Sequence, residues 1–196
     1  MAERKAFTSE DIGAELLPII TRGLYRDPLD TLREYVQNAI DAKARNVEVT
    51  INPDLVMIRD DGKGMDPDTA RRSIRLGISD KNPKQDVGFR GIGIYSAFNV
   101  CERLEVYTRT SISAPSKIIL DFDGVRTRLQ REEHHRLRGQ PSTLYLEQLL
   151  SESVWVEECH ECPISTQGTM VLMVGVKGPV AKRLSSRGEI KKYLES

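Results

Sequence analysis

Residues 33–51, REYVQNAIDAKARNVEVTI, constrain the fold more than any other stretch of the chain. The first part has the period of an amphipathic helix and the last part alternates like a strand, so a helix is expected to run directly into a sheet. Glu34, Asn38 and Asp41 fall on one stripe of that helix, opposite most of its apolar residues. Such a stripe is ordinarily solvated surface. The alternative is that it forms one wall of a site.

Turn residues and helix-start signals divide the rest of the chain into alternating helices and strands. Asp27 and Pro28 suit the cap and the first position of the central helix, and Pro67 and Asp68 mark another helix start. The segment 124–166 is charged, and we predict it to be irregular. We predict helices in 14–25, 26–44, 66–77, 91–100 and 188–196, and strands in 46–51, 55–60, 103–110, 117–123 and 168–176.

Length and hydrophobicity favour one domain. The chain has 196 residues, of which 39% are hydrophobic, and can bury one substantial core. No window approaches the roughly 18 apolar residues of a membrane span, and the first residues lack a signal-peptide apolar run. We therefore expect a soluble, cytoplasmic protein with no membrane contact.

The charge balance gives no reason to expect nucleic acid or an anionic membrane as a partner. Lys plus Arg and Asp plus Glu both number 29, so the formal net charge is zero. The run RTRLQREEHHRLRG, residues 126–139, is locally basic, but Glu132 and Glu133 interrupt it. A solvated helix face is favoured over a nucleic-acid surface for this run.

The three cysteines, Cys101, Cys159 and Cys162, are too few for a secreted disulfide scaffold, and reduced thiols are expected. Cys159 and Cys162 have the spacing of metal ligands, and His134 and His135 lie upstream. No second pair of ligands completes a zinc site, so free thiols are favoured over a bound metal.

Glycine-bearing loops beside strands and helices suggest a nucleotide site. The sequence has no GxxxxGK[ST], which excludes a Walker-type phosphate loop. GIGIYS, residues 91–96, matches the dinucleotide fingerprint only loosely, because Ser96 stands at the last glycine. Four segments taken together are more specific: EYVQNAIDA, DDGKGM, VGFRGIGIYSAF and the GT that begins the final strand.

In this order, the four segments resemble the nucleotide-binding boxes of the superfamily shared by gyrase, ninety-kilodalton heat-shock chaperones, histidine kinases and MutL. The resemblance covers 29–109 and 168–174 and is closest in wording to the chaperones. It implies the Bergerat ATP-binding fold, an α/β (α+β) two-layer sandwich with a mixed, mainly antiparallel sheet and helices on one face. The domain would span 1–196, with a divergent insertion at about 124–166.

The resemblance also implies a function, which is magnesium-dependent ATP binding with slow hydrolysis, used as a conformational switch. The chaperones closest in wording carry a following domain whose lysine reaches the terminal phosphate. The chain would then be an N-terminal fragment or a stand-alone module, acting through a downstream domain or through nucleotide-dependent self-association. The output of the switch, on a client protein or on DNA, stays open.

Residue roles follow from matching the boxes. Asn38 would supply an amide oxygen to Mg²⁺ bound with the nucleotide, and Glu34 would accept a proton from the attacking water. Asp60 would accept a hydrogen bond from the adenine amino group, with Asp41 as a supporting carboxylate. The remaining matched residues are Gly62 and Gly64 beside the base, Met65 against its face, Thr169 near the adenine, and Gly88, Gly91 and Gly93 at the phosphates. Ser79, Lys81 and Arg90 are candidate lid or phosphate residues, and an ordinary surface role for them stays open.

Two other functions stay open. A histidine or serine kinase domain would transfer phosphate to a partner and would not need the carboxylate at Glu34, so the sequence favours the hydrolytic branch. A module that only binds nucleotide is favoured if the phosphate-contacting lysine is never supplied.

Overall fold

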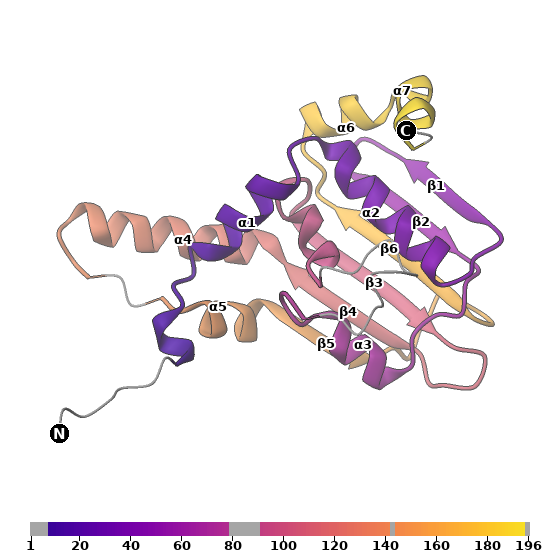
Figure 1. Ribbon diagram of the computed structural model, residues 1–196, viewed down its shortest axis with the longest axis horizontal. Helices are drawn as coiled ribbons and strands as arrows, with labels where there is room; N and C mark the ends of the chain where they lie inside the picture. Colours follow the sequence, from indigo (N-terminus) through magenta and orange to yellow (C-terminus); the bar gives the residue numbers. More distant parts are fainter. Residues whose placement is uncertain (1–7, 79–90, 142–143, 195–196) are drawn as a thin grey trace.

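The structure, a computed structural model, describes residues 8–78, 91–141 and 144–194. Figure 1 shows a twisted sheet with helices packed along it and α4 extending beyond one end. The helices are η1 Ser9–Asp11, α1 Leu16–Leu24, α2 Pro28–Asp41, α3 Pro67–Ser73, η2 Gly93–Asn99, α4 Phe122–Leu137, α5 Leu146–Ser153, α6 Gly178–Leu184 and α7 Arg187–Leu194. The strands are β1 Val47–Ile51, β2 Leu55–Asp60, β3 Arg103–Arg109, β4 Ser116–Asp121, β5 Val154–Glu158 and β6 Gly168–Val174.

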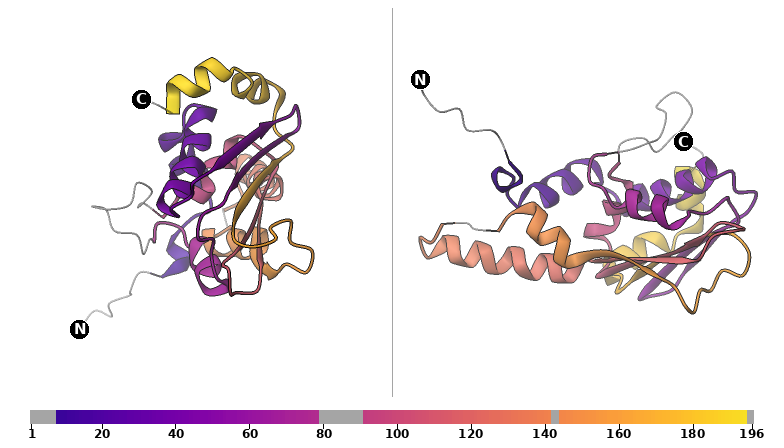
Figure 2. Two further views of the ribbon diagram at one scale, coloured as in Figure 1. Left: turned by 90° about the vertical axis from the view of Figure 1, so that its right-hand side faces the viewer. Right: turned by 90° about the horizontal axis from the view of Figure 1, so that it is seen from below.

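The six strands form one sheet in the order β1-β2-β6-β3-β4-β5. The last strand in the sequence, β6, lies between β2 and β3. All pairings among the described strands are antiparallel, so the parallel pairing that a mixed sheet implies is not found in them. The expected two-layer α+β architecture is confirmed, because α2 and α3 lie over one face of the sheet (Figure 2).

Strand alternation explains why this face is buried. Side chains two residues apart point to the same face, and register aligns them into rows across the sheet. These rows pack with the helices in the main core. One row contains Val49, Ile58, Val171, Val106, Ile118 and Val156, and the next contains Ile51, Val56, Met173, Leu104, Leu120 and Val154.

Helix α2 begins where the sequence predicts. The Asp27 carboxylate accepts the Leu29 N–H at 2.9 Å, and the Asp30 carboxylate accepts the Asp27 N–H at 2.9 Å. Pro28 occupies the first turn, where its missing N–H costs nothing. A reciprocal capping box of this kind fixes the N-terminus of a helix and stabilises it by about 1 kcal/mol.

Two long-range hydrogen bonds attach α2 to η2. The Thr31 hydroxyl donates to the Ser96 carbonyl at 3.0 Å, and the Tyr35 hydroxyl donates to the Ile94 carbonyl at 3.2 Å. Both donors lie on the buried face of α2. The polar stripe of α2 is therefore held at a fixed rotation beside the glycine-bearing segment.

The prediction that 124–166 is irregular is wrong, because this segment contains most of α4, all of α5 and β5. Strand β4 ends at Asp121, whose carboxylate caps α4 by accepting the Gly124 N–H at 3.0 Å. Only a narrow stripe of α4 is buried, including Val125 and Leu129, and charged residues cover the rest. This composition hides the helical period. Helix α6 was also not predicted.

Candidate functional site

The helix-facing side of the sheet becomes polar at one end. After the two apolar rows, the next aligned positions are Asp60 on β2, Thr169 on β6 and Thr108 on β3. Thr108 is fully buried, accepts the Met65 N–H at 2.9 Å and donates to the Gly168 carbonyl at 3.2 Å. Its hydroxyl also lies 3.2 Å from that of Thr169. Three central strands therefore meet at one polar row.

Thr108 was not among the predicted site residues. The signal for it is present in β3, because Leu104 and Val106 are apolar at the alternate positions and Thr108 continues the same face. A hydroxyl at a position that the pattern reserves for the core needs a partner. Its partners come from β6 and from the loop at Met65, and neither can be identified before the strands are paired.

Asp60 is a partly buried carboxylate whose identified hydrogen bonds are to backbone N–H groups. Its Oδ1 accepts the Gly62 N–H at 2.8 Å. Burial raises the pKa of Asp60, and backbone hydrogen bonds from Gly62 and Thr169 offset only part of this effect. Within the described part of the chain, no ion pair neutralises it. Such a carboxylate suits a neutral hydrogen-bond donor.

The adjacent Asp61 has a different environment. It is exposed and accepts the backbone N–H groups of Arg45 and Asn46 at 2.7 and 2.9 Å. Hydrogen bonds from the backbone and side chain of Asn46, together with the Arg45 N–H, lower the pKa of Asp61. Asp61 thus fixes the turn after α2, whereas Asp60 lies in the polar row.

Gly62 and Gly64 are required by packing inside the protein. A Cβ on Gly62 would lie 2.8 Å from the Ala42 Cβ, and Gly64 has φ +66° with no room for a side chain beside the Arg109 carbonyl. The predicted reason was a close approach to the base. In the structure the close neighbours are the end of α2 and strand β3. Met65 follows this loop and packs partly buried against the core.

The stripe on α2 lies against the glycine segment. A Cβ on Gly93 would lie 2.6 Å from Glu34 Oε2 and 3.8 Å from Asn38 Nδ2. Glu34, Asn38 and Asp41 are all partly exposed, and each interacts within the protein. Asp41 ends α2 next to Ala42, which contacts Gly62. Helix α2 therefore spans from the glycine segment to the loop that follows Asp60.

Gly91 closes a segment whose interior is outside the described residues. Its φ is +68°, and its carbonyl accepts the Gly77 N–H at 2.9 Å. A Cβ on Gly91 would lie 2.5 Å from the Ile78 carbonyl oxygen, so only glycine fits. The predicted phosphate residue Gly88 and the lid candidates Ser79, Lys81 and Arg90 lie outside the described residues.

The helix predicted after the glycines is present as a 3₁₀-helix of seven residues, η2. A 3₁₀-helix has tighter turns and poorer hydrogen-bond alignment than an α-helix, so its dipole is a weaker basis for phosphate binding. The other donors named by the prediction are the backbone N–H groups of the glycine segment. The predicted phosphate contact depends on them rather than on a long helix.

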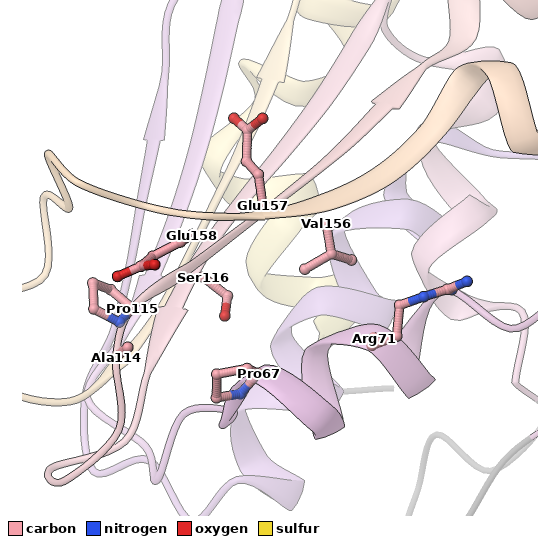
Figure 3. Close-up of a pocket in the computed structure, with 8 residues that line it drawn as sticks. All are labelled: Pro67, Arg71, Ala114, Pro115, Ser116, Val156, Glu157 and Glu158. Carbon is pink, nitrogen blue, oxygen red and sulfur yellow. The ribbon is translucent and has the colours of Figure 1, made fainter.

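A separate open pocket of about 270 Å³ lies between α3, the start of β4 and the end of β5. Figure 3 shows Pro67 and Arg71 on α3 opposite Ser116 and Val156 on the strands. Ser116 continues the polar row beyond Thr108, because the two residues are paired in register. None of the predicted nucleotide residues lines this pocket.

The sequence raised two other possibilities, a metal site at the cysteines and a nucleic-acid surface on the basic run. No group of three or more His, Cys, Asp or Glu side chains able to hold a metal occurs in the described ranges. The basic run lies on α4, where Arg128 pairs with Glu152 and Arg136 pairs with Glu15 at 2.8 Å. The sequence favours a solvated helix face for this run, and the two ion pairs are made with carboxylates outside it.

Comparisons with known proteins agree with this arrangement. A family model described as histidine kinase-, DNA gyrase B-, and HSP90-like ATPase matches residues 27–149, more than half of the chain. The chaperone protein htpG of Bacteroides fragilis is 27% identical over 159 residues, which is 67% of this chain and 23% of the relative.

DNA mismatch repair proteins MutL are also among the relatives. The one from Aquifex aeolicus is 32% identical over 97 residues, 44% of this chain and 23% of the relative. The one from Halobacterium salinarum is 33% identical over 92 residues, 42% of this chain and 14% of the relative. The chain thus spans less than a quarter of the length of these relatives.

Within the described ranges, no helix combines the length and the apolar character needed to cross a membrane. The matched family model, the four sequence boxes and the six-stranded sheet with helices over one face agree with one another. The chain belongs to the family of histidine kinase-, DNA gyrase B-, and HSP90-like ATPases.

Proposed function

We propose that this chain is a single magnesium-dependent ATP-binding domain that hydrolyses ATP slowly and acts as a conformational switch. The observation that supports the proposal most strongly is the approach of Gly93 to Glu34 and Asn38. This contact brings the EYVQNAIDA segment on α2 next to Gly93 of the glycine-bearing segment VGFRGIGIYSAF. Asp60, at the other end of α2, supplies the acceptor expected for a base.

The base end of the site is proposed from Asp60, Thr169 and Met65. The Asp60 carboxylate accepts a hydrogen bond from the adenine amino group, and a base with a carbonyl at that position is rejected because two acceptors would face each other. Thr169 presents a hydroxyl from the same row, and Met65 packs against the face of the ring. Asp41 supports this end from α2.

The phosphate end is proposed from the opposite part of the α2 stripe. The Asn38 amide oxygen is a ligand type that Mg²⁺ accepts, and the residues therefore fit a magnesium ion held with the nucleotide. Such an ion, when bound, neutralises phosphate charge. Glu34 orients a water toward the terminal phosphate and takes its proton. Gly88, Gly91 and Gly93 supply backbone N–H groups to the phosphates.

We also propose how the nucleotide state is transmitted. The relatives extend well beyond the matched segment, so self-association or a downstream domain is the proposed route. The described relatives are a chaperone and DNA mismatch repair proteins, which makes a client protein and DNA the two outputs to compare. A cytoplasmic location is part of the same proposal.

Product analysis with labelled ATP tests this function against its alternatives. Free phosphate supports hydrolysis, labelled protein supports a kinase, and unchanged ATP that still binds supports a binding-only module. Glu34→Ala is expected to keep ATP affinity and to slow hydrolysis by about a hundredfold. Hydrolysis at the parental rate in this variant would remove Glu34 from the reaction.

Two matched variants sharpen the assignment. Asn38→Ala is expected to remove the dependence of nucleotide affinity on magnesium, and an unchanged dependence would exclude Asn38 as a ligand. Glu48→Ala is the control for loss of a carboxylate, because Glu48 is exposed on β1 and its register places it on the other face of the sheet. It should change neither affinity nor turnover.

A further inference from the structure

Two cysteines outside the nucleotide site lie on either side of one turn, just after β5. Cys159 and Cys162 flank a turn made by His160 and Glu161. Cys159 is 7% exposed, and its N–H donates to the Pro115 carbonyl at 2.9 Å, which fixes it beside the start of β4. Cys162 is partly exposed. One thiol of the pair is therefore anchored and the other is accessible.

The turn brings the two sulfur atoms together. The ends of a four-residue turn have Cα atoms within about 7 Å, and disulfides span roughly 4.4–6.8 Å between Cα atoms. The Cys162 thiol lies close enough to raise the pKa of the Cys159 thiol. A bond between the sulfurs can form with little backbone movement.

We propose that Cys159 and Cys162 are a redox site that forms a reversible intramolecular disulfide with a hydroperoxide as oxidant. Both are free thiols in the structure. The third cysteine, Cys101, is fully buried on the core side and its thiol contacts the Ala97 carbonyl. Burial raises the pKa of the Cys101 thiol to about 12, so it stays unreactive.

The proposed reaction has two balanced steps. The Cys162 thiolate attacks one oxygen of hydrogen peroxide, the O–O bond breaks, and the departing hydroxide leaves as water after protonation. Cys162 is now a sulfenic acid. The Cys159 sulfur attacks the Cys162 sulfur, the S–O bond breaks, and a second water leaves with the proton from Cys159. Two thiols are oxidised and one peroxide is reduced to two waters.

The order of the steps follows from the environment of each thiol. Burial raises the pKa of Cys159, and the neighbouring Cys162 thiol raises it further. A thiol with a raised pKa is a poor first nucleophile, whereas it can attack a sulfenic acid held beside it. Cys162, which is more exposed, meets the peroxide first. Cys159 acts as the resolving thiol.

The disulfide would constrain the connection that enters the polar row. The chain runs from Cys162 through the buried Ile164 to Gly168, whose carbonyl accepts the Thr108 hydroxyl. Gly168 has φ +128° and packs against the Asp60 carbonyl. If the proposed function holds, oxidation should therefore change ATP affinity by roughly fivefold, the lower end of ordinary coupling between sites.

The chemistry is tested first, without nucleotide. The chain is treated with stoichiometric hydrogen peroxide and then with dithiothreitol, and its peptides are analysed by mass spectrometry. We expect one linkage between Cys159 and Cys162, lost on reduction, retained in Cys101→Ser and absent in Cys162→Ser. A sulfinic acid at Cys162, a linkage between two chains, or stoichiometric zinc that blocks both thiols would overturn the proposal.

ATP affinity of the oxidised and reduced chain is the second measurement, with Cys159→Ser as a control that cannot close the disulfide. A difference only in the parent supports the coupling. Equal affinities in the two states would remove the coupling while the redox site stands. Absence of ATP binding in both states would contradict the proposed function and leave the disulfide result intact.

Discussion

Asp60 and Glu105 are carboxylates on opposite faces of the same sheet, and the structure treats them differently. Glu105 is 8% exposed and is surrounded by partners: Arg103 Nε at 2.8 Å, Lys117 Nζ at 3.2 Å and the Tyr107 hydroxyl at 2.7 Å. The hydrogen bonds identified for Asp60 come only from backbone N–H groups.

The pKa values of the two side chains move in opposite directions. Burial alone would raise the pKa of Glu105, but hydrogen bonds from Tyr107 and Lys117 and the positive charges of Lys117 and Arg103 lower it overall. Burial raises the pKa of Asp60 because no comparable cation opposes it. A buried carboxylate with cations and a hydroxyl is a structural group. A carboxylate such as Asp60, which has no cation beside it among the described residues and can still accept a hydrogen bond, is suited to bind a ligand.

Asp60→Asn should give the largest effect on binding. The amide turns a donor toward the adenine amino group, and an unpaired buried polar group costs on the order of 1–3 kcal/mol on each side, so affinity should fall by roughly a hundredfold or more. Calorimetry with ATP measures this, and thermal unfolding confirms that the fold is kept. Affinity within a few-fold of the parent would show that the base binds elsewhere.

Glu105→Gln should lower the stability of the fold and leave ATP affinity unchanged. The substitution keeps the shape but leaves Lys117 and Arg103 without a negative partner, so the free energy of unfolding should fall by about 1–3 kcal/mol. ATP affinity should stay at the parental value, because the outer face does not contact the proposed site. A loss of affinity without a loss of stability would break the distinction between the two carboxylates.

Lowering the pH should have a smaller effect, seen as a loss of stability through Glu105 and a loss of ATP affinity through Asp60. The stability from ionised Glu105 is fully present above its unfolded-state pKa of about 4.3 and is lost as pH falls through its lower folded-state pKa. The difference in stability between the parent and Glu105→Gln should therefore shrink below about pH 4. ATP affinity should weaken on acidification as Asp60 protonates, at a higher pH than an ordinary aspartate would, because burial raises its pKa. A stability difference that persists at low pH, or an ATP affinity that acid does not change, would contradict the prediction.

Arg103→Gln should have the smallest effect. The Arg103 side chain is 49% exposed, whereas Lys117 is 21% exposed, so water already screens the pair of Arg103 with Glu105. Exposed ion pairs contribute about 0–1 kcal/mol, and a change of about 0.5 kcal/mol in the free energy of unfolding is expected. Chemical denaturation measures it. A loss as large as that of Glu105→Gln would mean that Arg103, not Lys117, stabilises the carboxylate.

The sequence predicts those parts of the fold whose signals are local. Helix α2 was found because Asp27, Pro28 and a regular apolar period all lie within it. Helix α4 was anticipated only as a solvated helix face in the basic run and its segment was otherwise expected to be irregular, because few of its positions face the core and its charged residues resemble a loop. Local signals thus identify strongly amphipathic elements and fail where burial is narrow.

The candidate site divides in the same way. Asp60, Asn38 and Glu34 could be named because each belongs to a short motif, and their roles stay predictions. Thr108 could not be named, because its neighbour Thr169 is distant in sequence and register brings them together. Gly62 and Gly64 were predicted to be glycines so that the backbone could approach the base. In the structure, a Cβ at either position would instead collide with other parts of the protein.

The central place of β6 has a consequence for how the chain folds during synthesis. Strands β2 and β3 each pair with β6 and not with each other, so the middle of the sheet stays open until the residues up to Val174 are available. Asp60 and Thr108 come into register only through that late strand. Contacts of such long sequence separation form slowly. A nascent chain that already carries the first three sequence boxes would therefore not yet be able to bind ATP.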